Sequence, residues 1–253
     1  MLEALRTARA ISRSLRIYYG DKERREAMDR LYAGFVRAGD LVFDVGAHVG
    51  DRIAAFRRLD ARVVAVEPQP ALARTLRLIY GRDPHVTIEA AAVGRQTGSV
   101  ELNVNVDNPS VSTASPNFIE AAAGAAGWEG QAWTDTIRVP LTSLDALIAR
   151  HGAPAFIKID VEGFEAEVLA GLSRPVPALS FEITTIQRDV ASTCIGQCDA
   201  LGLTRFNAAL GESQAFVYGD PVGADEISRW LAELPPEANS GDIYALANDV
   251  GTA

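Results

Sequence analysis

The sequence predicts an α/β fold, with a mostly parallel sheet and helices on both of its faces. From Asp40 onward, short apolar segments typical of buried strands alternate with amphipathic segments typical of helices. The clearest strands are 41–45 and 62–66, and each is followed by a helical pattern. A length of 253 residues suits one such domain with a substantial core and a small appendage.

The first 39 residues predict a helical extension to a main domain that spans 40–250. Over residues 1–30, eight Lys and Arg stand against five Asp and Glu, a charge of +3 that leaves −12 for the rest of the chain. A basic amphipathic helix can bind a membrane surface or an acidic partner protein. More often, its charged side chains simply face solvent while its apolar stripe packs against the protein. We expect the second helix, near 22–36, to cover the mouth of a ligand site.

The remaining elements follow in order along the chain. Pro70 suits the first turn of a helix that Gly81 ends. Residues 108–134 are polar and rich in Gly and Ala, which predicts a long irregular insertion. It would serve either as a functional loop or lid, or as a mobile loop that its tryptophans merely anchor. The other predicted helices are 143–148, a segment after 163, and 187–201, and the other predicted strands are 86–88, 99–106, 137–141, 155–160, 178–183, 203–207, 214–218 and 242–246.

The first strand leads into a turn bounded by glycines, Asp44-Val-Gly46-Ala47-His48-Val-Gly50. Without Cβ atoms the backbone can approach a bound molecule closely, and the helix that opens near 51 offers free N–H groups. The spacing is not the Gly-x-Gly-x-x-Gly of dinucleotide-binding turns, so a pyrophosphate is not favoured. A carboxylate at Asp44 can instead bind the ammonium of an amino-acid moiety. The turn therefore predicts a nucleoside cofactor site.

The second strand ends in Glu67 and Pro68. An acidic residue at this position is well placed to accept hydrogen bonds from the two hydroxyls of a ribose. Two strand ends then converge on one ligand. Glu67 and Pro68 are accordingly predicted to belong to the cofactor site.

A third motif, Lys158-Ile-Asp160-Val-Glu162-Gly163, follows a buried strand. Because side chains alternate along a strand, Lys158 and Asp160 share one face. A structural ion pair would explain the two charges. However, a strand with a purely structural role in a parallel sheet is expected to be apolar throughout, because buried charges carry a desolvation cost. The motif therefore favours a functional group of ionisable side chains at this strand end.

These three motifs resemble the FkbM family of S-adenosylmethionine-dependent methyltransferases, over about residues 40–184. The third motif is the most specific to that family. The resemblance implies a Rossmann-like class I methyltransferase sheet of seven mostly parallel strands with an antiparallel edge member. It also implies that the turn from Asp44 to Gly50 holds the methionine part of S-adenosylmethionine, Glu67 the ribose and the segment around Ala91 the adenine.

The reaction expected from these motifs is methyl transfer to a hydroxyl of a sugar, glycan or secondary-metabolite acceptor. Asp160 or Glu162 would take the hydroxyl proton, while Lys158 holds the carboxylate or the acceptor oxygen. Asp160 with Glu182 would alternatively ligate Mg²⁺ or Mn²⁺, and the sequence does not decide between the two versions. The predicted acceptor contacts are Ser112, Trp128, Trp133 and Glu182, through hydrogen bonds and ring stacking.

Two other functions stay open on the sequence alone. A nicotinamide-dependent oxidoreductase would use a similar sheet, although the missing third glycine and Asp44 argue against it. A non-catalytic module that kept the nucleoside pocket is the second alternative. It could dock through its basic N-terminal helix.

The composition excludes several classes of partner and site. A net charge of −9 and a pI of about 4.9 argue against nucleic-acid binding, which depends on clustered Lys and Arg. Cys194 and Cys198 lack the further ligands of a metal set and are expected to be ordinary buried thiols. No apolar run of eighteen residues and no signal-peptide core occur, so we expect a cytoplasmic protein without a transmembrane segment. A homodimer is left open.

Overall fold

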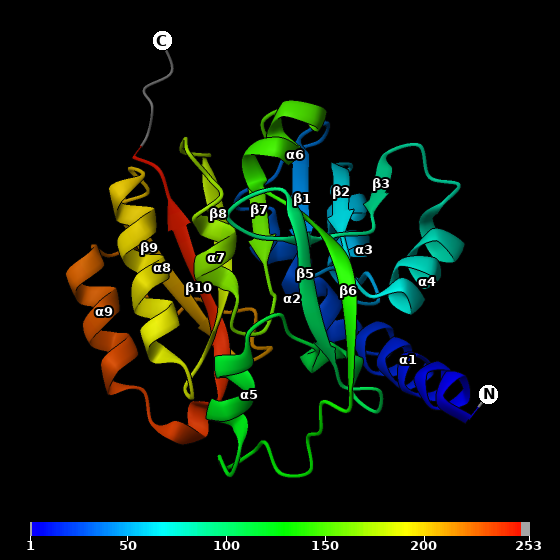
Figure 1. The fold of residues 1–253 in the computed structure, drawn as a ribbon. Helices are drawn as coiled ribbons and strands as arrows, with labels where there is room; N and C mark the ends of the chain where they lie inside the picture. Colours follow the sequence, from blue (N-terminus) through cyan, green and yellow to red (C-terminus); the bar gives the residue numbers. More distant parts are fainter. Residues whose placement is uncertain (1, 249–253) are drawn as a thin grey trace.

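The structure is a computed structural model that describes residues 2–248, so the predicted domain end at 250 lies outside the described residues. A central sheet carries the fold, with strand order β3-β2-β1-β7-β8-β10-β9 (Figure 1). Its strands are β1 Leu41–Val45, β2 Arg62–Val66, β3 Val86–Glu89, β7 Phe156–Ile159, β8 Ala178–Thr184, β9 Arg205–Leu210 and β10 Ser240–Leu246. The predicted α/β class and the seven mostly parallel strands are therefore confirmed.

The antiparallel member of the sheet is β10. It pairs antiparallel with β8 on one side and with β9 on the other, so it lies one strand inside the edge. The predicted strand at Gln214–Tyr218 is wrong. Gln214 has a positive φ of 51° and Phe216 is 41% exposed, so this segment is not an extended strand, although Val217 N donates to the carbonyl of Ala208 in β9.

Helices cover both faces of the sheet (Figure 1). One face packs against α6 Leu144–His151, α7 Glu165–Leu169, α8 Arg188–Ala200 and α9 Ala224–Glu233. The other face packs against α2 Lys22–Tyr32, α3 Asp51–Arg58 and α4 Pro70–Tyr80. Helix α1 Leu2–Gly20 lies beside α4, where the hydroxyls of Tyr19 and Tyr80 are 2.7 Å apart. Both cysteines are buried and free in α8, as predicted.

A small second sheet carries the predicted insertion. It has the order β4-β6-β5, with β4 Ala92–Val93, β5 Gly98–Val104 and β6 Asp135–Thr142. The predicted strand near 99–106 thus joins this sheet and not the central one. Residues 105–134 connect β5 to β6 and are less irregular than predicted, because they contain the short helices η1 Pro109–Val111 and α5 Pro116–Ala122.

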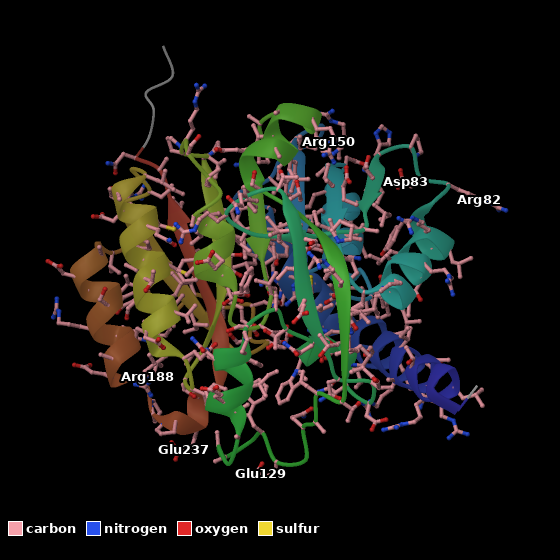
Figure 2. All side chains as sticks on the ribbon, in the orientation of Figure 1. Arg82, Asp83, Glu129, Arg150, Arg188 and Glu237 are labelled. Carbon is pink, nitrogen blue, oxygen red and sulfur yellow. The ribbon has the colours of Figure 1, made fainter. Side chains whose placement is uncertain are left out.

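Charge is distributed unevenly between the surface and the strand ends. Arg82, Glu129 and Glu237 project from the outside of the molecule (Figure 2). Asp44 and Lys158, in contrast, are each 1% exposed inside the central sheet. Buried charges at this depth are costly unless they are paired or bind a ligand, so they mark the part of the fold that packing alone does not explain.

Gly46 permits the closest backbone approach in the sheet. It has a positive φ of 86°, and a Cβ built there would lie 1.7 Å from the carbonyl oxygen of Asp160. The turn after β1 therefore crosses directly over the end of β7. A side chain at this position would push the two strand ends apart.

We expect Gly46→Ala to lower the free energy of unfolding by at least about 4 kcal/mol or to prevent folding, because steric overlap adds to the cost of a positive φ. Gly39→Ala is the matched control, since Gly39 has a φ of 85° and nothing within 4 Å of a built Cβ. It should cost only about 1–2 kcal/mol. Urea unfolding of both variants measures the difference, and equal losses would contradict the close approach.

Candidate active site

A cavity of about 280 Å³ lies at the carboxyl ends of β1, β2, β7 and β8. Ligands bind at this edge in open α/β sheets, where the strand order changes direction. The cavity is lined by most of the sequence-predicted site residues, namely Asp44, Gly46, Ala47, His48, Glu67, Pro68, Ala91, Ser112, Trp128, Lys158, Asp160, Glu162 and Glu182. Gly50 and Trp133 are the predicted residues that do not line it.

The turn after β1 presents two buried polar atoms without partners. Asp44 Oδ2 and His48 Nε2 have no hydrogen-bond partner among the described residues. Burial raises the pKa of Asp44 to about 7 and lowers the pKa of His48. At Gly50 packing also requires a glycine, because a Cβ there would lie 2.7 Å from the Tyr80 ring, where α3 begins beside α4.

Glu67 ties the two cofactor turns together. Its Oε2 accepts a hydrogen bond from His48 N at 2.9 Å, and its Oε1 accepts one from Gln69 N at 2.8 Å. Burial raises the pKa of Glu67 to about 8, although these two N–H donors act in the opposite direction. Each carboxylate oxygen has a second lone pair, so Glu67 can still accept from a ligand.

Lys158 is held in a buried ion-pair network. Its Nζ lies 2.8 Å from Asp242 Oδ1 and 3.2 Å from Asp160 Oδ2, and it donates to the carbonyl of Ile159 at 3.3 Å. Burial alone would lower the pKa of Lys158, but the two carboxylates more than offset this and raise it. Burial would likewise raise the pKa of Asp160, and the positive charges of Lys158 and Arg52 lower it. Asp160 is thus the ionised carboxylate of this strand end.

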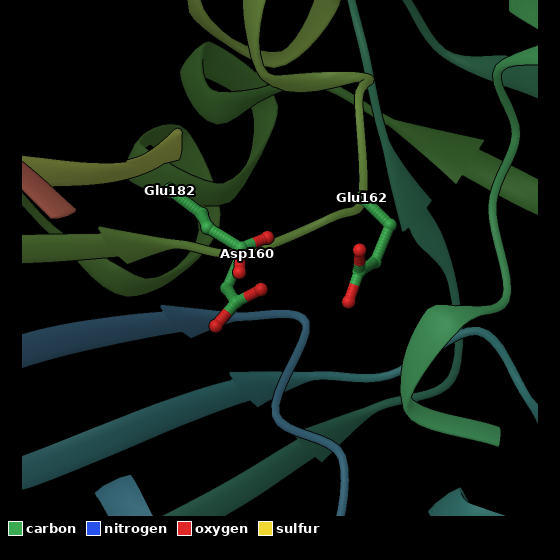
Figure 3. A group of neighbouring side chains, drawn as sticks. All are labelled: Asp160, Glu162 and Glu182. Atoms are coloured by element: carbon green, nitrogen blue, oxygen red, sulfur yellow. The ribbon is translucent and has the colours of Figure 1, made fainter. Parts of the chain in front are cut away.

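Three carboxyl groups converge beside Lys158. One oxygen each from Asp160, Glu162 and Glu182 lies within 4.8 Å of the others, and Figure 3 shows Asp160 next to Glu182 with Glu162 turned to the same side. Burial, with the adjacent charge of Asp160, raises the pKa of Glu162 and of Glu182 well above that of a free carboxyl. Glu162 has a positive φ of 58°, which turns the chain sharply between β7 and α7.

The N-terminal helices reach the cavity through an aromatic ring and an arginine. Tyr18 lines the cavity, packs edge-on against the His48 ring at 5.5 Å, and lies beneath the Arg24 guanidinium at 4.7 Å. Arg24 Nη2 in turn lies 3.2 Å from Asp51 Oδ2 and 2.8 Å from Glu212 Oε2. Helices α1 and α2 and the loop after β9 therefore meet over the cofactor turn.

The insertion closes the cavity on the side of the second sheet. Gln69 Nε2 donates to the carbonyl of Pro109 at 2.9 Å, and Thr113 Oγ1 donates to the carbonyl of Glu162 at 2.6 Å. Trp128 lines the cavity, is 8% exposed and has an Nε1 without a partner among the described residues. Trp133 instead donates to the carbonyl of Val111 at 2.7 Å and anchors the insertion.

Several site residues were not foreseen from the sequence. Asp242 lies in a predicted strand. A charged residue within this apolar strand could have indicated that Asp242 belongs to the site. Arg52 and Glu212 line the cavity and lie 3.3 Å apart, but they are 160 positions apart in the chain. Tyr18 and Glu212 carry no local pattern that sets them apart from ordinary surface residues.

The sequence of this region matches a family model described as "Methyltransferase FkbM domain", over residues 44–234. The chain belongs to this family. It is therefore an S-adenosylmethionine-dependent methyltransferase, and the FkbM resemblance inferred from the three motifs is confirmed. Asp242 lies beyond the matched residues. No curated protein sequence matches the chain.

Solved structures of other methyltransferases are similar at low identity. A precorrin-6y C5,15-methyltransferase from Geobacter metallireducens has a TM-score of 0.44 and 13% identity, with 88% of this chain and 87% of that chain covered. A TehB-like methyltransferase from Corynebacterium glutamicum has a TM-score of 0.43 and 11% identity, with 88% of each covered. Fibrillarin from Aeropyrum pernix, crystallised with S-adenosyl-L-methionine, has a TM-score of 0.41 and 11% identity, with 84% and 68% covered. The family assignment rests on the sequence match.

Across residues 2–248, none of the helices combines the length and the apolar character that a membrane crossing requires.

The buried Asp44 predicts a pH-dependent stability. Its pKa of about 7 in the folded protein lies above the value of about 3.9 expected for an unfolded chain. Its ionisation therefore destabilises the free protein progressively as the pH rises between these two values. Asp44→Asn removes that ionisation. The variant should therefore gain stability over the parent between pH 5 and pH 8, by up to about 4 kcal/mol.

Urea unfolding at both pH values measures this gain. Asp220→Asn is the control, because Asp220 is exposed and should leave the pH profile unchanged. A gain for Asp44→Asn that does not grow with pH would show that Asp44 is already ionised at low pH in the free protein.

Proposed function

We propose that this methyltransferase transfers the methyl group of S-adenosylmethionine to a hydroxyl of a sugar, glycan or other small polyhydroxylated acceptor. The observation that carries the proposal is the convergence of Asp44, Glu67 and Asp160 on one cavity from three separate strand ends. A net charge of −9 also makes a nucleic-acid acceptor a poor fit.

The two turns after β1 and β2 supply the proposed cofactor contacts. Asp44 is 1% exposed with one unpartnered oxygen, so it suits the ammonium of the methionine part, which would relieve the cost of its burial. Glu67 has lone pairs left for the ribose hydroxyls. Ala91 belongs to the apolar part of the lining, where it would contact the adenine ring.

The residues near β7 would carry the reaction. S-adenosylmethionine supplies a methyl group on a sulfonium that already has its leaving group. The chain must then align the acceptor oxygen and remove one proton. We assign proton removal to Asp160, because the positive charges of Lys158 and Arg52 lower its pKa, whereas burial and the charge of Asp160 raise the pKa of Glu162 and of Glu182. In its protonated form, either glutamic acid can donate a hydrogen bond to an acceptor oxygen.

The same carboxylates support a second version of the chemistry. A divalent cation on Asp160 and Glu182 would lower the pKa of the acceptor hydroxyl and replace the general base. Turnover after removal of metal by a chelator separates the two versions. Undiminished turnover excludes the cation version, and lost turnover that Mg²⁺ or Mn²⁺ restores supports it.

Residues 1–39 are proposed to act as a cover on a methyltransferase domain that spans 40–250. Tyr18 in the cavity wall and Arg24 between Asp51 and Glu212 support this role. The insertion 108–134 would form the opposite wall, with Ser112 and Trp128 toward the acceptor. Trp133 would support it from behind through the bond to Val111.

In the general-base version, Asp160→Asn should lower kcat by about 10²–10⁴-fold, because the proton then has no ionised acceptor. Affinity for S-adenosylhomocysteine, the cofactor product, should change less than about threefold. Calorimetry measures that affinity, and release of S-adenosylhomocysteine in the presence of a panel of polyhydroxylated acceptors measures turnover.

Glu67→Ala tests the cofactor contacts in the same two assays. It should weaken S-adenosylhomocysteine binding at least about tenfold, because the ribose loses a charged hydrogen-bond acceptor and the two cofactor turns lose their link.

Full activity in Asp160→Asn would remove Asp160 from the role of base. Tight S-adenosylhomocysteine binding without methyl transfer to any acceptor of the panel would instead favour a non-catalytic module.

A further inference from the structure

Helices α1 and α4 carry a concentration of positive charge on an acidic protein. The sequence holds seven Arg and no Asp or Glu over residues 4–20 and 68–82, although the whole chain has a net charge of −9. The two helices lie side by side, with the hydroxyls of Tyr19 and Tyr80 2.7 Å apart (Figure 1). Their arginines therefore belong to one region of the surface.

Most of this positive charge is not neutralised by the chain itself. Arg6 and Arg13 bind the carboxylate and the carbonyl of Asp107. Asp83, the next acidic residue after α4, pairs with Arg57 at 2.8 Å. Five arginines are exposed and have no ion pair or side-chain hydrogen bond among the described residues, and Figure 2 shows the last of them projecting outward: Arg9, Arg16, Arg74, Arg77 and Arg82.

Exposed apolar side chains lie among these arginines. Among the described residues, six large apolar side chains are exposed, and four of them belong to α1 and α4: Leu5, Ile17, Leu78 and Ile79. These four and the five exposed arginines make up what we call the α1–α4 face. Leu5, Arg9 and Arg16 share one side of α1, because they are separated by four and seven positions. Arg74 and Leu78, which is 82% exposed, are likewise four positions apart on α4.

The inner sides of both helices are already bound to the protein. Ile11 of α1 and Leu72 of α4 are buried in one cluster with Val49. The Tyr19 hydroxyl also donates to the carbonyl of Val49 at 3.0 Å. A solvated polar side over an apolar stripe would explain these inner contacts and the arginines. It does not explain why leucine and isoleucine side chains project from the outer side.

We propose that the α1–α4 face docks on a membrane surface rich in anionic lipid headgroups. Guanidinium groups bind phosphate oxygens through paired hydrogen bonds, and unpaired arginines are attracted to the negative potential of such a surface. Apolar side chains next to them enter the boundary between headgroups and acyl chains, as in helices that lie in the plane of a membrane. The protein then rests on the bilayer and does not cross it.

The mixture of charge and apolar side chains favours a lipid surface over other occupants. An acidic protein partner would match the arginines, but Leu78 protrudes at 82% exposure and does not line a groove that a partner would fill. A second copy of the chain, placed by a two-fold axis, would bring its own arginines against this face. The proposal does not depend on the identity of the methyl acceptor or on the role of Asp160.

Vesicle co-sedimentation of the full chain tests the proposal. We expect the protein to sediment with phosphatidylcholine vesicles that contain about one-third phosphatidylglycerol, and not with phosphatidylcholine alone. Raising the salt from about 50 mM to about 500 mM should weaken the binding at least about tenfold, because it screens the arginines. Arg74→Gln and Leu78→Ser should each weaken it at least about threefold, since one removes a charge and the other an apolar anchor.

The matched controls are an arginine and an apolar residue outside the α1–α4 face. Arg174→Gln changes an exposed arginine before β8, and Val217→Ser changes a side chain that is 42% exposed after β9. Both should bind anionic vesicles like the parent, and thermal unfolding checks that all four variants are folded.

Two outcomes would overturn the proposal. One is no binding of the parent to anionic vesicles at low salt, and salt-sensitive binding of polyglutamate by the same protein would then assign the face to an acidic protein partner. The other is vesicle binding that Arg74→Gln and Leu78→Ser leave unchanged, which would place the contact elsewhere on the molecule.

Discussion

The buried ammonium of Lys158 is the interaction on which this site depends. It forms ion pairs with both Asp160 and Asp242 from the middle of the central sheet, where it is 1% exposed. Without it, a strand end that already carries Glu162 and Glu182 would gain further uncompensated negative charge in a region of low dielectric constant. The apolar strand partners Ile157 and Ile159 fix Lys158 in place from the opposite face of the sheet.

Much of the fold and of the site could be predicted because the informative residues are local in sequence. Glu67 and Asp160 directly follow apolar strands, and Asp44 is the next-to-last residue of another. Parallel strands place their carboxyl ends at the same edge of the sheet. This geometry follows from the strand pattern alone. Together, the three motifs indicated the family, with the motif at 158–163 the most specific, and the family match confirms this prediction.

The remaining parts of the site depend on contacts between distant segments. Arg24, Asp51 and Glu212 meet across 188 positions, and nothing in their local patterns connects them. The strand predicted at Gln214–Tyr218 failed for a related reason. Its alternating apolar residues satisfy the pattern of a strand. However, Gln214 has a positive φ of 51°, and the segment contacts the open edge of β9 at Val217 N, which donates to the carbonyl of Ala208, without forming a ladder.

The position of β10 has a consequence for how the protein matures on the ribosome. This strand is the last of the described elements to be synthesised, and it must enter between β8 and β9, which are both made earlier. Until it does, Lys158 lacks Asp242, and β8 presents an open edge. The nascent chain therefore completes its charged centre only after the residues of β10 have left the ribosome, so the sheet stays open between β8 and β9 until then.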